Sequence, residues 1–177
     1  RVGFRSFEKF STQETANMTA EPYFNLFTYA LQDTAGKYQG KELRFYADTI
    51  ITEIFESNSE ATRMMAIEGI LVLNLWMALV HELEQTLSNC KKQLIADADG
   101  IHSIDEAVAY WIGDGQVFGN GTKGHLLYAL SERMGEMFGI DENGQSRTNT
   151  NILRLFNQAR LELSFPSACS ESPNTYP

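Results

Sequence analysis

The chain has 177 residues, 43% of them hydrophobic, and its 23 acidic and 14 basic residues leave a formal net charge of -9. This length and apolar content predict one compact domain, because domains commonly contain roughly 100 to 200 residues. Lysine and arginine clusters provide most of the affinity for phosphate groups. No such cluster occurs, so the composition argues against a nucleic acid or an anionic membrane as partner.

Apolar residues recur at helical spacing through most of the chain, and no alternating pattern is long enough to build a sheet. We therefore expect an all-α, single-domain bundle of five or six helices around a long central apolar helix. The domain is expected over 22–165, with an N-terminal arm over 1–21 and a C-terminal tail or linker over 166–177. The helices are predicted from Pro22, over 41–56, over 60–89, and in the regions 101–113, 125–139 and 149–163.

The predicted helix over 60–89 begins at a cap, either Asn58 or Ser59, and has no charge from Gly69 to Val80. A membrane span needs about 20 apolar residues. This run has about 12 and is closely flanked by charged residues, so we expect no transmembrane segment. A helix that is apolar on nearly all sides is instead typical of the centre of a bundle. Asn74 is the polar exception, and a buried amide needs hydrogen-bond partners.

Two short helices joined by a glycine-rich loop are predicted in the stretch from Ile101 to Gly139. Ser103 and Glu106 form a capping-box pattern at the start, and Gly113 is suited to a left-handed residue where the first helix ends. The loop lacks a preceding strand and a phosphate-loop lysine, so its glycines indicate a structural connection rather than a nucleotide site.

The last predicted helix follows an Asn143-Gly144 turn and is capped by Thr148 or Asn149. Its expected apolar face consists of residues at helical spacing, namely Ile152, Leu155, Phe156, Ala159 and Leu163.

The two cysteines, Cys90 and Cys169, allow only one intramolecular disulfide, and two free thiols are the alternative. Asn17 and Asn120 each begin an N-glycosylation sequon. Together these features favour an extracellular or cell-surface location.

The sequence contains no recognisable catalytic pattern, since neither a Ser-His-Asp nor a Cys-His arrangement can be assembled, and we expect no enzyme. A calcium loop is approached by Asp97, Asp99 and Glu106 around Gly100. Ile95 would then occupy the first position, which requires an oxygen ligand. An acidic turn followed by a helix cap explains these residues better.

A metal site is the sharper hypothesis. Glu106 and Tyr110 are four residues apart on one predicted helix, while His125, Tyr128 and Glu132 share a face of the next. Phenolate, carboxylate and imidazole groups together suit a cation such as ferric iron. The alternative is that both tyrosines are core residues with satisfied hydroxyls and that the carboxylates are cap and surface charges.

These helices carry a family resemblance. The segments DEAVAYWIG and GHLLYALSERMGEMFG resemble a recurring pattern of algal secreted proteins, including the green-algal iron-assimilating proteins and the diatom phytotransferrins. Upstream, PYFNLFTYA and ADTIITEIF are loosely similar to the helical segment that precedes this pattern in diatom surface proteins. The resemblance covers Pro22 to Gly139, and its specific part is Asp105 to Gly139.

The resemblance implies a secreted or cell-surface protein that is not an enzyme and that binds ferric iron together with a synergistic anion. Asp105, Glu106, Tyr110, Tyr128 and Glu132 are the residues that fall in the matching motif. The same pattern also occurs in surface proteins built from repeats. Two functions are therefore expected. One is a binding protein whose partner is a metal ion, and the other is a structural module of an extracellular matrix, filament or adhesive assembly whose partner is other copies of itself.

Overall fold

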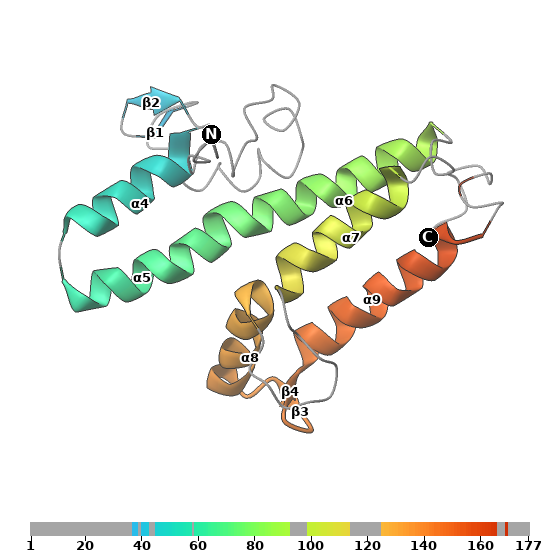
Figure 1. Ribbon diagram of the computed structural model, residues 1–177. Coiled ribbons are helices and arrows are strands. Elements are labelled where there is room, and N and C mark those ends of the chain that lie inside the picture. The colour runs from blue at the N-terminus through green and yellow to red at the C-terminus, as the bar shows by residue number, and fades with distance from the viewer. Residues whose placement is uncertain are drawn as a thin grey trace. The chain divides into compact units, whose positions relative to one another are not determined.

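The computed structural model describes residues 37–38, 40–42, 45–57, 59–92, 99–113, 125–165 and 169, and these are mostly helical, as predicted (Figure 1). In this part of the chain the elements are β1 (Lys37–Tyr38), β2 (Lys41–Glu42), α4 (Tyr46–Glu56), α5 (Glu60–Ile70), η2 (Leu71–Leu75), α6 (Trp76–Lys91), α7 (Asp99–Ile112), α8 (Leu126–Phe138), β3 (Asp141–Glu142), β4 (Gln145–Ser146) and α9 (Arg147–Leu163). The chain divides into two compact units, the first ending at Val80 and the second beginning at His81.

The first unit contains a short hairpin before α4. Strands β1 and β2 pair antiparallel, with Lys37 opposite Glu42 and Tyr38 opposite Lys41. The turn between them includes Gly40, whose φ of 76° favours glycine. Because Lys41 belongs to this hairpin, α4 begins at Tyr46, and the prediction that the helix starts at Lys41 was wrong.

Helix α4 packs against α5 through small residues and one large aliphatic side chain. Ala47, Ile51 and Ala66 are fully buried. A Cβ atom added at Gly69 would lie 3.2 Å from the Cδ1 atom of Ile51. A methyl group at Gly69 would therefore press on the far end of the Ile51 side chain and not on the backbone of α4.

The elements α5, η2 and α6 form one continuous helix, Glu60–Lys91. It begins at Ser59, whose hydroxyl accepts a hydrogen bond from the Thr62 amide in a capping box, so the predicted cap is confirmed. Within η2 the helix widens, and the amide of Trp76 donates to the carbonyl of Leu71, five residues earlier. Asn74 lies in this wide turn.

Burial along this helix is uneven. Residues 77–82 are all buried, and they include the polar His81 and Glu82, whereas α5 exposes several large apolar side chains. By length and composition, Glu60–Lys91 could cross a membrane, and half of its most apolar window is buried. Buried core helices meet the same criteria, so the absence of a transmembrane segment stays a prediction.

The second unit is built on α7, α8 and α9, which contact one another. Helix α7 buries Ile104, Ala107 and Trp111 along one side. It begins at Asp99, one turn before Ser103, so the predicted capping box lies inside the helix and does not start it. The predicted end is confirmed, because Gly113 follows the helix with a φ of 77°.

Helix α8 ends at the left-handed Gly139, and the β3–β4 hairpin follows. Asn143 and Gly144 form its turn with φ values of 55° and 77°, as the turn prediction required. Helix α9 then begins after Ser146, so Thr148 and Asn149 lie within it and are not its cap.

The buried face of α9 agrees with the predicted one at Phe156 and Leu163, while Ile152 and Ala159 are half-buried. Asn149, Leu153, Phe156 and Leu163 are buried, whereas Leu155 is exposed. The buried residues are spaced by three, four or seven positions, and this row includes a polar residue.

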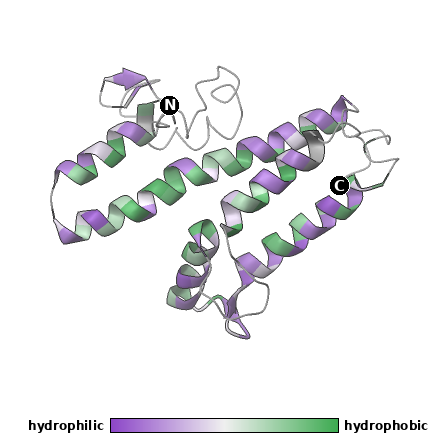
Figure 2. Ribbon diagram, in the orientation of Figure 1, coloured by the Kyte–Doolittle hydropathy of each residue, from purple (hydrophilic) through white to green (hydrophobic). Residues whose placement is uncertain are grey.

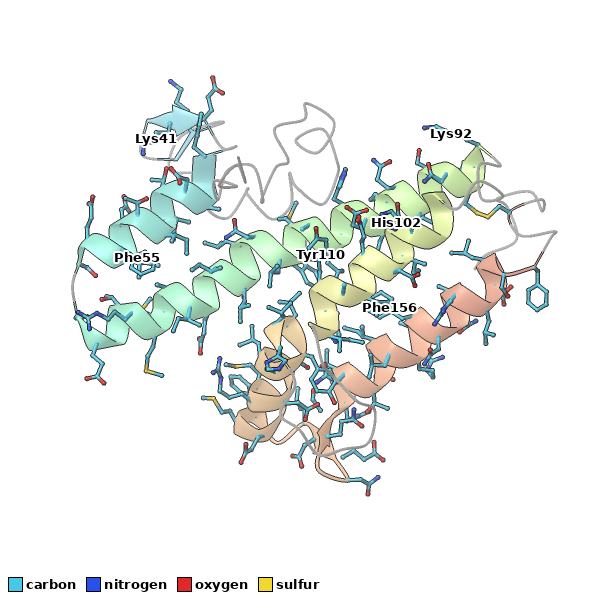
Figure 3. The ribbon with its side chains drawn as sticks, viewed as in Figure 1. Lys41, Phe55, Lys92, His102, Tyr110 and Phe156 are labelled. Carbon is cyan, nitrogen blue, oxygen red and sulfur yellow. A yellow bond between two sulfur atoms is a disulfide. The ribbon has the colours of Figure 1, made fainter. Side chains whose placement is uncertain are left out.

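Cys90 at the end of α6 and Cys169 form a disulfide across a sequence separation of 79, so the pairing alternative is confirmed (Figure 3). Several predictions fall outside the described residues. These are the arm, the helix from Pro22, both sequons at Asn17 and Asn120, the near-calcium residue Asp97, most of the glycine loop, and the tail apart from Cys169.

Candidate functional site

Glu132 is the centre of a polar cluster where α8 meets β4 and the start of α9. Both of its carboxylate oxygens accept from the amide of Ser146, at 3.2 and 3.1 Å. The side-chain amide of Asn149 donates to the same carboxylate. Because a helix N-terminus has unsatisfied amides and a positive dipole end, Glu132 stabilises the beginning of α9 from another helix.

Asn149 connects this carboxylate to two further elements. Its Nδ2 atom also donates to the carbonyl of Tyr128 at 3.0 Å, and its Oδ1 atom accepts from the indole nitrogen of Trp111 at 3.0 Å. One buried amide thus joins α7, α8 and α9. Buried polar groups are costly unless paired, so this set fixes how the three helices fit together.

The hydroxyl of Tyr128 accepts from the side-chain amide of Gln145 at 3.0 Å. Burial raises the pKa of this hydroxyl, the Glu132 carboxylate raises the pKa further, and the Gln145 hydrogen bond opposes the rise. Tyr128 therefore holds its proton more firmly than an exposed tyrosine.

The close approach of α8 to β4 depends on Gly135. A Cβ atom added there would lie 2.9 Å from the Cβ and 3.2 Å from the Cα of Ser146. The hydroxyls of Ser131 and Ser146 lie 3.0 Å apart and share a hydrogen bond beside this contact.

The five predicted metal ligands lie in different surroundings. Tyr128 and Glu132 are adjacent on α8 in the cluster just described. Glu106 lies 3.1 Å from the imidazole of His102 on the exposed side of α7, and His125 is exposed at the start of α8. Tyr110 is half-buried on α7 (Figure 3).

A metal ion at Glu132 would have to replace N–H donors that already occupy its oxygens. Among the described residues, no group of three or more histidine, cysteine, aspartate or glutamate side chains could hold a metal ion. The arrangement suits the alternative set out for these residues, in which a tyrosine is buried with a satisfied hydroxyl and a carboxylate acts as a helix cap.

Sequence reasoning missed Trp111, Gln145, Ser146 and Asn149, which supply most of this cluster. The available signal was Asn149 itself, because it continues the row of Leu153 and Phe156 at helical spacing. A polar residue in an otherwise apolar row indicates a buried hydrogen-bonding group.

Each compact unit also exposes a group of large apolar side chains. On the first unit, the group that we call the α5 face consists of Met64, Met65, Ile67, Val72 and Trp76, and the first three are 62%, 58% and 63% exposed. On the second, the group that we call the α8 end consists of Met137, Phe138 and Ile140, and the first two are 67% and 71% exposed. Apolar patches of this kind mark interaction sites.

The chain was compared with known protein families, curated proteins and solved structures. No protein family, no curated protein and no solved structure matches the chain.

Proposed function

We propose that the chain is a non-enzymatic structural module of an extracellular or cell-surface assembly. The observation that carries this proposal is the exposure of an apolar patch on each compact unit, the α5 face on one and the α8 end on the other. Because burying apolar surface is the main driving force of association, a chain with two such patches is suited to contact a neighbour through each of them.

The disulfide supports the proposed location. Disulfides form and persist in oxidising compartments outside the cytosol. The bond between Cys90 and Cys169 closes a loop that contains α7, α8 and α9, so it stabilises the second unit against unfolding.

Sedimentation velocity over a range of protein concentrations tests the proposal. We expect species larger than a dimer, because two separate patches allow an assembly to grow. Met65→Glu and Phe138→Glu each place a charge in one patch, so each single variant should stop growth at small species and the double variant should be a monomer. Gln158→Glu adds the same charge at an exposed position outside both patches and should assemble normally. A wild-type chain that is monomeric at every concentration would refute the proposal.

We keep ferric-iron binding, the function that the family resemblance implies, as a second proposal. The adjacency of Tyr128 and Glu132 supports it, because a phenolate and a carboxylate side by side could contribute two ligands. Binding there requires Glu132 to release its N–H donors and Tyr128 to lose a proton that its surroundings retain.

Addition of ferric iron with bicarbonate tests this second proposal. Binding through tyrosinate should produce a visible charge-transfer absorption that Tyr128→Phe removes, and Tyr110→Phe tests the other predicted phenolate. An unchanged spectrum together with an unchanged thermal midpoint would rule out iron binding at these residues.

A further inference from the structure

The turn of the β3–β4 hairpin consists of Asn143 and Gly144, and both residues are exposed. Figure 2 shows the hairpin as hydrophilic. The side-chain amide of Asn143 forms no hydrogen bond with any described residue. Asparagine is among the thermolabile residues of proteins, and an exposed amide without a hydrogen-bond partner is open to attack by its own backbone.

The backbone nitrogen of Gly144 is the nearest possible nucleophile. Across the hairpin Glu142 pairs with Gln145, and the Gly144 amide donates no hydrogen bond to a described residue. A Cβ atom added at Gly144 would have no atom within 4 Å. Because glycine has no side chain, nothing on this residue blocks the approach of its nitrogen to the side-chain carbonyl carbon of Asn143.

The hairpin can open without disturbing the helices beside it. Both residues of β3 are exposed, and they pair with only two residues of β4. Strand β4 is held separately, through Gln145 and Ser146, by hydrogen bonds to side chains of α8. A ladder this short, with no buried side chain on one strand, opens at a low free energy. The turn can therefore reach other conformations while the second unit stays folded.

We propose that Asn143 is a site of spontaneous deamidation in the folded protein, and that its isoaspartate product loosens the contact of β4 with α8. The Gly144 nitrogen attacks the Cγ atom of Asn143, and the side-chain nitrogen leaves as ammonia with the proton that Gly144 loses. Water then opens the cyclic imide. Breaking the bond from the Gly144 nitrogen to Cγ gives aspartate, and breaking its bond to the main-chain carbonyl carbon gives isoaspartate.

Isoaspartate places an extra atom in the backbone of the turn, because the chain then runs through the former side chain. The length of a hairpin turn fixes the register of its strands, so the pairing of Glu142 with Gln145 must shift. Ser146 follows directly, and its amide is the one that Glu132 binds. The modification thus reaches the polar cluster. This inference goes beyond the assembly function and does not depend on it.

Peptide mapping of the folded full-length chain after incubation tests the site. Trypsin cleaves after arginine and lysine, so Asn143 lies in the peptide 134–147 and Asn157 in the peptide 155–160. Asn157 is an exposed internal control, because the backbone nitrogen that follows it belongs to α9. We expect deamidation at Asn143 to be faster by about tenfold or more, and to accelerate with pH as the attacking nitrogen loses its proton. Asn120, which also precedes a glycine, falls in the separate peptide 93–123.

Thermal denaturation of aged molecules tests the consequence. Anion exchange isolates molecules with the additional negative charge, and an isoaspartate-specific methyltransferase identifies the isoaspartate among them. We expect their thermal midpoint to lie about 2–4 °C below that of fresh protein. Asn143→Asp has the charge without the extra backbone atom and should lose less. Asn143→Gly keeps a turn that two glycines suit, and it should neither change in mass at this peptide nor lose stability on incubation.

Three results would overturn the inference. If the peptide 134–147 is deamidated no faster than the peptide 155–160, Asn143 is not a deamidation site of the folded chain. If aged molecules unfold at the same temperature as fresh protein, the modification does not reach the contact of β4 with α8. If Asn143→Gly loses stability on incubation as fast as the wild type, another change is responsible. None of these results bears on assembly, so the proposed function is tested separately.

Discussion

The interactions that stabilise each compact unit internally differ in kind. In the second unit a carboxylate, a buried amide, an indole and backbone groups form specific hydrogen bonds, and a disulfide closes the loop around them. In the first unit α4 and α5 meet through small and aliphatic residues, and two buried polar atoms, Thr49 Oγ1 and Asn74 Oδ1, have no hydrogen-bond partner. Among the described residues, the contacts of α7, α8 and α9 are therefore specified by polar pairing, whereas the contact of α4 with α5 is specified by apolar packing.

Loss of the disulfide should cause the largest decrease in the free energy of unfolding, and this decrease should be confined to the second unit. Replacing both cysteines, in Cys90→Ser/Cys169→Ser, removes a cross-link over 79 residues, and the chain-entropy model gives a loss of about 4.5 kcal/mol in the free energy of unfolding. Urea denaturation followed by tryptophan fluorescence measures this loss. Helix α5 should be affected far less, which hydrogen exchange can show. Equal losses of protection in both units would show that the two units unfold together.

Removing the carboxylate at the centre of the polar cluster should be the next largest effect. Glu132→Ala leaves the amide of Ser146 and one bond of Asn149 unsatisfied, so we expect a loss of about 3 kcal/mol in the free energy of unfolding. Glu136→Ala removes an exposed carboxylate one turn later on the same helix and should change the free energy by less than about 0.5 kcal/mol. If the two variants lose equal stability, Glu132 does not hold α9 in place.

A glycine-to-alanine substitution should lower the stability in one unit and raise it in the other. Gly135→Ala forces a methyl group against the backbone of Ser146, at 3.2 Å from its Cα, and should destabilise the protein by about 1–2 kcal/mol despite the gain in helix propensity. Gly69→Ala meets only the far end of the Ile51 side chain, which can move, so the propensity gain of up to about 1 kcal/mol should prevail. Thermal denaturation of both variants measures the difference, and a shared sign would show that the two contacts are equally rigid.

The smallest effect concerns pH. The pKa of Tyr128 in the folded chain is raised above its ordinary value of 10.0. The stabilisation that this provides is fully present below pH 10.0 and is lost as the pH rises through the folded-state pKa. We expect the free energy of unfolding to fall above pH 10.0 and Tyr128→Phe to flatten that fall. Parallel pH profiles for the two proteins would contradict the assignment.

The sequence predicted most of the helices because their signals are local. Ser59, Gly113 and the Asn143-Gly144 turn act through their own backbone neighbours, so their roles could be inferred without a structure. The predicted start of α7 was wrong because it also depended on a local signal alone. A capping box at Ser103 competes with a helix that can begin one turn earlier at Asp99.

The polar cluster could not be predicted because its contacts join distant residues. Trp111 and Asn149 are 38 positions apart, and Glu132 and Ser146 are 14 apart. Tyr128 and Glu132 were selected for their chemistry as metal ligands, but hydrogen-bond donors from β4 and α9 surround them. Helical spacing placed both residues on one face correctly and gave no information about what faces them.

The wide turn η2 determines the rotational phase of everything that follows it in the helix. Closing a turn over five residues instead of four adds one residue, and each residue turns an α-helix by about 100°. Deleting one residue within Leu71–Leu75 would thus restore an ordinary helix and rotate α6 by about 100° relative to α5. The residues between Trp76 and His81 would then turn relative to α5, so Met77 and Ala78, both buried in the first unit, would leave their present positions.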